Sequence, residues 1–301
     1  MASSVFVFGE PLAELADIRG DTARLGVGGD TFNTAVYIAR SGVPVAYVSA
    51  LGGDPLSRRV LGMMTEEGIG TESVLAVPGR PVGLYAIETD EVGERSFTYW
   101  RSASAFRAWF EADGHEEAFG RMAKADLLYL SGITLSAFSP ANRDRVIGLA
   151  DQVRRNGGRV AFDTNYRPAG WEDANTACET IRALMPSVSL ALPTFEDEAA
   201  LFGYDAPEAC LDAWRSAGAD EVCIKHGAAG ALLSNHGWVA PTRLVRPVDT
   251  TGAGDSFNGA YLAGRLKGQD PLRAATGANE LAGRVITVRG AIIPKEAVPT
   301  A

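Results

Sequence analysis

Hydrophobic runs of four or five residues alternate with longer amphipathic stretches through the second half of the chain. The runs predict buried strands at 127–130, 160–163, 188–192 and 221–225, and the stretches between them predict helices, the first of which opens at Ser139-Pro140. Strands that alternate with helices are joined by right-handed crossovers, which gives a mostly parallel, doubly wound sheet. The pattern therefore predicts an α/β fold that binds ligands at the carboxyl ends of its strands.

The two ends of the chain extend this pattern. A strand is predicted at 5–8, and a helix that starts at a glycine pair ends near residue 41. A second helix has Asp54 as its cap and Pro55 at its first position, and it ends at Gly68. Towards the C-terminus, helices are predicted at 255–267 and 271–287, and 285–288 is strand-like.

Two segments show the two-residue alternation of partly exposed strands. Short strands are predicted within 11–26, and the runs 82–88 and 95–101 predict a β-hairpin with a polar, glycine-containing loop. Alternation places Tyr99 and Arg101 on one face of this hairpin. The arginine can be a surface cation–π partner, or it can bind a carboxylate through its bidentate guanidinium.

Composition narrows the class of protein. The 301 residues are 46% hydrophobic and 22% charged, as in a soluble globular enzyme with a sizeable core. A net charge of −9 disfavours nucleic-acid binding, because no basic stripe is available to neutralise a phosphate backbone. The N-terminus is strand-like rather than signal-like, no run suits a membrane span, and three cysteines lack metal-ligand spacing. We expect a reduced, cytoplasmic protein.

The segment best suited to chemistry is the turn Gly252-Ala253-Gly254 in front of a predicted helix. Glycines let a ligand approach the backbone, and the first turn of a helix offers unpaired N–H groups, so the turn predicts an anion hole for phosphate. Asp255 follows directly and is either a helix cap or a base aimed at a group bound beside the phosphate. Asp249 is a second acid at the same turn.

Three further polar groups lie at helix starts or strand ends. Gly29 precedes a helix whose Asp30 and Asn33 suit hydroxyl groups, although a capped turn explains them equally well. The segment 163–167, Asp-Thr-Asn-Tyr-Arg, is either a salt-bridged turn or part of a site. The segment 225–230, Lys-His-Gly-Ala-Ala-Gly, is either a hairpin turn or a ligand loop.

A longer string around the glycine-rich turn is much more specific than a Gly-x-Gly pattern. Residues 249–260 read Asp-Thr-Thr-Gly-Ala-Gly-Asp-Ser-Phe-Asn-Gly-Ala, which resembles the C-terminal signature of the ribokinase-like, or PfkB, family of carbohydrate kinases. The segment 28–33, Gly-Gly-Asp-Thr-Phe-Asn, resembles the family's N-terminal signature, with Thr31 as a departure that is similar to the 2-keto-3-deoxygluconate kinase branch. The hairpin is also most similar to that branch.

The resemblance implies a ribokinase-like fold with a small lid. Residues 1–10, 28–80 and 105–301 would form the α/β domain, and 11–27 and 81–104 would form a discontinuous β-sheet lid over the sugar. By the same resemblance, the residues that contact the substrate would be Gly29, Asp30, Asn33, Tyr85, Tyr99, Arg101, Arg167 and Asp249. Those on the nucleotide side would be Asn165, Lys225, Gly227, Gly230, Gly252, Gly254 and Asn279.

The implied reaction is ATP-dependent phosphorylation of 2-keto-3-deoxy-D-gluconate at its terminal hydroxyl. Asp255 would accept the hydroxyl proton, and the backbone N–H groups of Gly252, Ala253 and Gly254 would stabilise charge on the moving phosphoryl group. Arg101 and Arg167 would explain why an acidic protein prefers an acidic sugar. Two arginines would thus offset the repulsion locally.

Metal and partner expectations follow from the same resemblance. Mg²⁺ is expected because the phosphates of ATP need a hard counter-cation. Thr194 and Asp197, with Glu198 adjacent, stand where the family carries an Asn-x-x-Glu motif that organises magnesium through water, although an acidic first helical turn explains them as well. A monovalent cation near Asp249 and a homo-oligomer formed through the lid are further expectations.

Two alternatives remain open. Another ribokinase-like kinase, acting on the galacto epimer, fructose or ribose, would carry the same motifs. A catalytically silent sugar-binding relative belongs to a different class, and the intact Asp255 and anion hole argue against it. Turnover of ATP with any sugar discriminates between the two classes.

Overall fold

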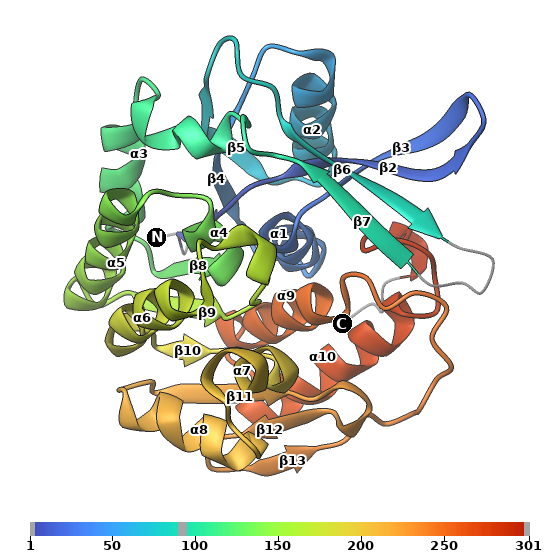
Figure 1. The fold of residues 1–301 in the computed structure, drawn as a ribbon. Helices are drawn as coiled ribbons and strands as arrows, with labels where there is room; N and C mark the ends of the chain where they lie inside the picture. Colours follow the sequence, from blue (N-terminus) through green and yellow to red (C-terminus); the bar gives the residue numbers. More distant parts are fainter. Residues whose placement is uncertain (1–3, 90–94, 298–301) are drawn as a thin grey trace.

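The structure is a computed structural model that describes residues 4–89 and 95–297, and its core is a nine-stranded sheet (Figure 1). The strand order is β13-β12-β11-β10-β9-β8-β1-β4-β5. The strands are β1 (Val5–Phe8), β4 (Ala46–Leu51), β5 (Gly70–Ala76), β8 (Leu127–Ser131), β9 (Arg159–Asp163), β10 (Leu190–Ala191), β11 (Glu221–Lys225), β12 (Ala231–Leu233) and β13 (Gly237–Val239). Among these described strands, β12 pairs antiparallel with both β11 and β13, and every other pair is parallel, which confirms the mostly parallel sheet.

Helices cover both faces of this sheet because side chains of a strand alternate between two cores. Val5 and Val7 of β1 pack into one cluster with α1, α2, α9 and α10, whereas Phe6 and Phe8 pack into the other with α3, α5, α6 and α8. The helices are α1 (Asp30–Arg40), α2 (Pro55–Glu66), α3 (His115–Met122), α4 (Gly132–Ser136), α5 (Pro140–Arg155), α6 (Ala174–Leu184), α7 (Phe195–Phe202), α8 (Pro207–Ser216), α9 (Ala253–Leu266) and α10 (Pro271–Val285). This is the predicted doubly wound architecture.

A separate four-stranded sheet projects from one side of the molecule (Figure 1). It comprises β2 (Leu12–Arg19), β3 (Thr22–Gly28), β6 (Gly83–Thr89) and β7 (Arg95–Trp100), in the order β3-β2-β6-β7. These are the two segments whose alternation predicted exposed strands. The polar loop of the predicted hairpin lies at 90–94, outside the described residues.

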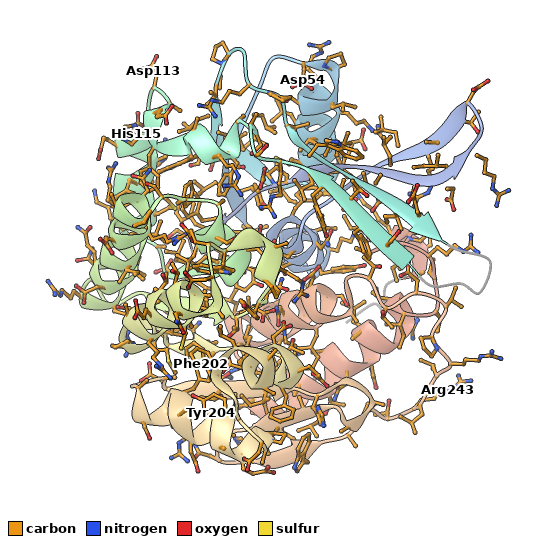
Figure 2. The ribbon with its side chains drawn as sticks, in the orientation of Figure 1. Asp54, Asp113, His115, Phe202, Tyr204 and Arg243 are labelled. Atoms are coloured by element: carbon orange, nitrogen blue, oxygen red, sulfur yellow. The ribbon has the colours of Figure 1, made fainter. Side chains whose placement is uncertain are left out.

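Short sequence patterns predicted the start of α2 correctly and the end of α10 incorrectly. The Asp54 carboxylate caps α2 as predicted, accepting from the N–H groups of Leu56 at 2.9 Å and Ser57 at 3.0 Å, and Figure 2 shows Asp54 beside that helix at the edge of the molecule. The strand predicted at 285–288 is wrong. Val285 ends α10 and Ile286 keeps helical backbone angles, because burial of Val285 against the helical core outweighs the strand preference of its branched side chain.

The described residues contain neither a disulfide nor a helix that could span a membrane. Cys178, Cys210 and Cys223 are free thiols. Within 4–89 and 95–297, no helix is long and apolar enough to cross a bilayer.

Candidate active site

Polar residues collect where neighbouring strands of the large sheet end. Glu10 follows β1, Ser131 ends β8, Asp163 ends β9 and Lys225 ends β11. Because these strands are parallel, their carboxyl ends share one edge of the sheet. The helices α1 and α9 pack together next to this edge, below β6 and β7 in Figure 1.

The N-terminus of α9 has the geometry of the predicted anion hole. Gly252 precedes the helix with φ 76°, and a Cβ at this position would lie 2.6 Å from the Cβ of Ala291, so only glycine fits. Gly252 has no side chain that could cap the first turn of α9, and the N–H group of Ala253 donates to the carbonyl oxygen of Thr250 at 3.2 Å. The N–H groups of Gly252 and Gly254 form no hydrogen bond within 4–89 and 95–297, which is the arrangement that an anion site at a helix start requires.

Asp255 lies in the first turn of α9 and faces the first turn of α1. Its Oδ2 accepts a hydrogen bond of 2.8 Å from Nδ2 of Asn33. Burial raises the pKa of the Asp255 carboxyl to about 7, the negative charge of Asp30 acts in the same direction, and the bond from Asn33 opposes both. A carboxylate that titrates near neutrality suits a general base better than a helix cap.

The start of α1 is fixed by a second required glycine. Gly29 has φ 114°, and a Cβ there would lie 2.5 Å from the carbonyl oxygen of Glu10. Asp30 follows, and its carboxylate accepts from Oγ of Ser131 at 2.5 Å and from Nδ2 of Asn165 at 3.0 Å. Burial raises the pKa of Asp30. The amide of Asn165, expected at the nucleotide phosphates, thus bonds to Asp30 on the predicted sugar side.

Lys225 lies beside the anion hole. Its Nζ is 3.5 Å from the point that a Cβ on Gly254 would occupy, and it forms a buried ion pair of 2.6 Å with Oδ2 of Asp163. Gly227 begins and Gly230 closes a single 3₁₀ turn that joins the antiparallel strands β11 and β12, so this segment is a hairpin connection, which spans residues 226–230. The turn also follows directly on the lysine that faces Gly254.

Asn279 and Asp249 have structural partners around the same site. Nδ2 of Asn279, on α10, donates to the carbonyl oxygen of Val239 at 2.9 Å and so ties α10 to the end of β13. The buried carboxylate of Asp249 accepts from the backbone N–H groups of Thr251, at 3.0 Å, and of Gly290. Asp249 therefore shapes the loop that leads into α9.

Both arginines predicted to bind a carboxylate already have an acidic partner. Nε of Arg101 donates to Oε2 of Glu10 at 2.8 Å, and the two side chains are only 17% and 1% exposed. Nη1 of Arg167 pairs with Oδ1 of Asp197 at 2.9 Å, but the Arg167 side chain is 57% exposed. Sequence reasoning missed Glu10 as a partner because nothing local connects it to a residue 91 positions away.

Aromatic side chains of the small sheet form a short stack. The rings of Tyr85 and Tyr99 lie 5.9 Å apart, and Phe97 and Tyr99 are stacked at 6.4 Å. The hydroxyl of buried Tyr85 donates to Glu14, whereas Tyr99 is 52% exposed. Tyr99 is thus the tyrosine with an open ring, and burial raises the pKa of both phenols.

The two acidic residues considered for magnesium differ in access. Glu198 is fully buried, and its carboxylate accepts from Oγ1 of Thr164 and from Sγ of Cys210, the latter at 3.5 Å. Burial raises the pKa of Glu198 to about 7. Asp197 is partly exposed. Among the described residues no group of three or more His, Cys, Asp or Glu could hold a metal ion.

An uncapped helix N-terminus, a lysine beside it and a carboxyl of raised pKa are the parts that phosphoryl transfer to a hydroxyl requires. Fold and site together define a phosphotransferase of the α/β class. The sequence profile described as pfkB family carbohydrate kinase matches residues 5–298, and the chain belongs to that family.

Individual relatives agree with this assignment. The 2-dehydro-3-deoxygluconokinase of Escherichia coli K12 is 40% identical over 309 residues, which cover 99% of this chain and 100% of the relative. The enzyme of the same name from Dickeya dadantii is 39% identical, with 98% of each chain covered.

Solved structures show the same fold. The 2-dehydro-3-deoxygluconokinase from Thermotoga maritima has a TM-score of 0.84 at 22% identity, covering 99% of this chain and 97% of that one. A putative ribokinase II from Escherichia coli, solved in complex with ATP and Mg²⁺, has a TM-score of 0.83 at 23% identity, covering 99% and 96%. These likenesses confirm the ribokinase-like fold.

Proposed function

We propose that the chain transfers a phosphoryl group from ATP to the terminal hydroxyl of 2-keto-3-deoxy-D-gluconate, the sugar acid also called 2-dehydro-3-deoxygluconate, to give 2-keto-3-deoxy-6-phosphogluconate. The relatives that carry this activity in their names match this chain over almost its whole length. The observation that carries the proposal is the carboxyl of Asp255, which has a pKa of about 7 and lies in the first turn of a helix that no side chain caps.

The catalytic step divides between one side chain and the backbone. Asp255 accepts the proton of the attacking hydroxyl, and Asn33 orients its carboxylate through the 2.8 Å bond. The N–H groups of Gly252 and Gly254, which the helix start holds in place before the reaction, stabilise the charge of the transferring group, and that of Ala253 joins them by leaving the carbonyl oxygen of Thr250. Lys225 adds a positive charge to the same location.

The sugar acid is held by groups on both sides of Asp255. Gly29, Asp30 and Asn33 bind its hydroxyls, and Tyr85 and Tyr99 of the lid cover it, Tyr99 with its open ring. Of the two arginines, Arg167 keeps more of its guanidinium accessible and supplies the first contact to the substrate carboxylate, and Arg101 supplies the second from its fixed position on Glu10.

ATP supplies the phosphoryl group, and Mg²⁺ neutralises charge on its phosphates. We assign the water-mediated magnesium contact to Asp197 rather than Glu198, because both oxygens of Glu198 are buried and bonded. Gly227, Gly230, Asn165 and Asn279 are assigned to the nucleotide side, as the resemblance of their motifs to the family implies. The monovalent cation near Asp249 stays a prediction.

A homo-oligomer formed through the lid is the expected assembly. Among the described residues, four exposed large hydrophobic side chains besides Tyr99 lie on the four-stranded sheet: Ile18, Leu25, Phe97 and Trp100, each 40–56% exposed. A second copy would remove this apolar surface from water. Light scattering of the purified chain, with Ile18→Lys as an interface variant, tests the assembly.

The function is tested by a coupled ADP-release assay with MgATP. The panel is 2-keto-3-deoxygluconate, its galacto epimer, fructose, ribose and adenosine, and Asp255→Asn is the matched inactive control. We expect a preference for the keto-deoxy acids. A preference for a neutral sugar would keep the kinase and refute the carboxylate argument, and no turnover with any sugar would favour a silent sugar-binding relative.

A further inference from the structure

A buried polar network lies directly under the anion hole, and its central residue, Asp163, has no assigned role. Oδ2 of Asp163 accepts from Nζ of Lys225 at 2.6 Å and from Nδ2 of Asn258 at 2.7 Å. The same amide of Asn258 donates to the hydroxyl of Tyr129 at 3.1 Å. One carboxylate oxygen therefore connects the ends of β9 and β11 to α9.

The lysine in this network keeps donors free for a ligand. Its ammonium has three N–H groups, and the bond to Asp163 is the single hydrogen bond of that side chain within 4–89 and 95–297. Because Nζ lies 3.5 Å from the Cβ position of Gly254, the remaining donors are next to the backbone that binds the anion. Burying a lone ammonium here would be costly, and the carboxylate of Asp163 compensates its charge.

The helix that carries the base is held by the same carboxylate. Asp255 and Asn258 are three positions apart on α9, so they lie on one face of the helix. Asp255 bonds to α1 through Asn33, and Asn258 bonds to Asp163. The carboxylate of Asp163 therefore helps to set both the rotation of α9 and the position of Lys225.

We propose that Asp163 is a positioning residue for phosphoryl transfer, which holds the ammonium of Lys225 and the helix of Asp255 at a fixed separation across the anion hole. The proposal rests on the proposed kinase function and concerns the transferred group rather than the sugar. Asp163→Asn removes the charge that faces Lys225 but keeps an oxygen that can accept from Asn258, so this variant acts through the lysine, lowers kcat and leaves the KM for the sugar acid nearly unchanged.

The test is a double-mutant cycle on kcat, measured by ADP release at saturating MgATP and sugar acid with Asp163→Asn, Lys225→Met and the double variant. We expect Asp163→Asn to lower kcat about 10- to 100-fold, with the sugar KM within about twofold. In the Lys225→Met background, Asp163→Asn should cost nothing further, because its effect passes through the lysine.

The matched control is Asp220→Asn, which breaks an exposed ion pair with Arg154 and should leave kcat unchanged. Additive losses in the cycle, or an unchanged kcat in Asp163→Asn, would refute the positioning role. If Asp163→Asn alone does not fold, Lys225→Met and the double variant decide: a further loss of about tenfold in the double variant contradicts the proposal. Failure of the kinase function itself is distinguishable, since the unmodified chain would then release no ADP.

Discussion

The pKa of Asp255 leads to a prediction with a defined sign and size. A base must be ionised to accept a proton, so activity falls as pH drops below the pKa of about 7. With that pKa, the ionised fraction is about 0.9 at about pH 8 and about 0.1 at about pH 6, so kcat/KM falls about tenfold over this interval. A carboxyl with an ordinary pKa near 4 would give a change of only about 1% over the same range.

Two substitutions shift the acidic limb of the pH profile, over which activity rises with pH, in opposite directions. Asp30→Asn removes a negative charge that raises the pKa of Asp255, so the limb shifts to lower pH. Asn33→Ala removes a hydrogen bond that lowers that pKa, so the limb shifts to higher pH. The assay is ADP release at saturating Mg²⁺ from about pH 5.5 to about 9. Titration of ATP itself is not moved by either substitution, so identical profiles for all three proteins would refute the base assignment.

The remaining predictions concern stability and geometry. Asp255→Asn should raise the free energy of unfolding at about pH 8 by about 1–3 kcal/mol, since the carboxylate is ionised in the folded state above its raised pKa, and the gain should vanish towards about pH 4 in thermal melts. Arg101→Leu should cost about 3–5 kcal/mol in urea unfolding because Glu10 is left buried and unpaired, whereas Arg167→Ala should cost under about 1 kcal/mol and mainly raise the KM for sugar acids. Gly252→Ala should cost more than about 1 kcal/mol and lower kcat, because alanine at φ 76° is strained and meets Ala291; a melt and a rate equal to those of the unchanged chain would contradict this.

The fold was predictable where each element carries its own signal. The buried strands between residues 127 and 225 are short hydrophobic runs, and α2 has both a capping aspartate and a proline at its first position. The failure at 285–288 has a different origin. Branched residues there favour a strand locally, but Val285 is buried by contacts with Tyr37 and Ile293, which a local pattern does not contain.

The backbone positions of the candidate site could be predicted from the sequence, but few of the contacts between its side chains could. Gly29 and Gly252 stand where only glycine fits, which the two motifs indicated. The partners of the charged residues were not predicted, because Lys225 meets Asp163 across 62 positions and no local spacing records such a pair. Ser131, which bonds to Asp30, was missed although it directly follows a predicted strand, where the polar residues of an α/β site collect.

The bond between Asn33 and Asp255 joins residues 222 positions apart, and this separation bears on how the enzyme is made. During synthesis, the start of α1 and both strand pairs of the small sheet are complete long before α9 leaves the ribosome. Domains fold from the N-terminus as they emerge, so the nascent chain holds α1 without its partner helix α9 until the last fifth of the chain is translated. A messenger RNA cut before codon 253 would therefore yield a product without the base, however well its earlier part had folded.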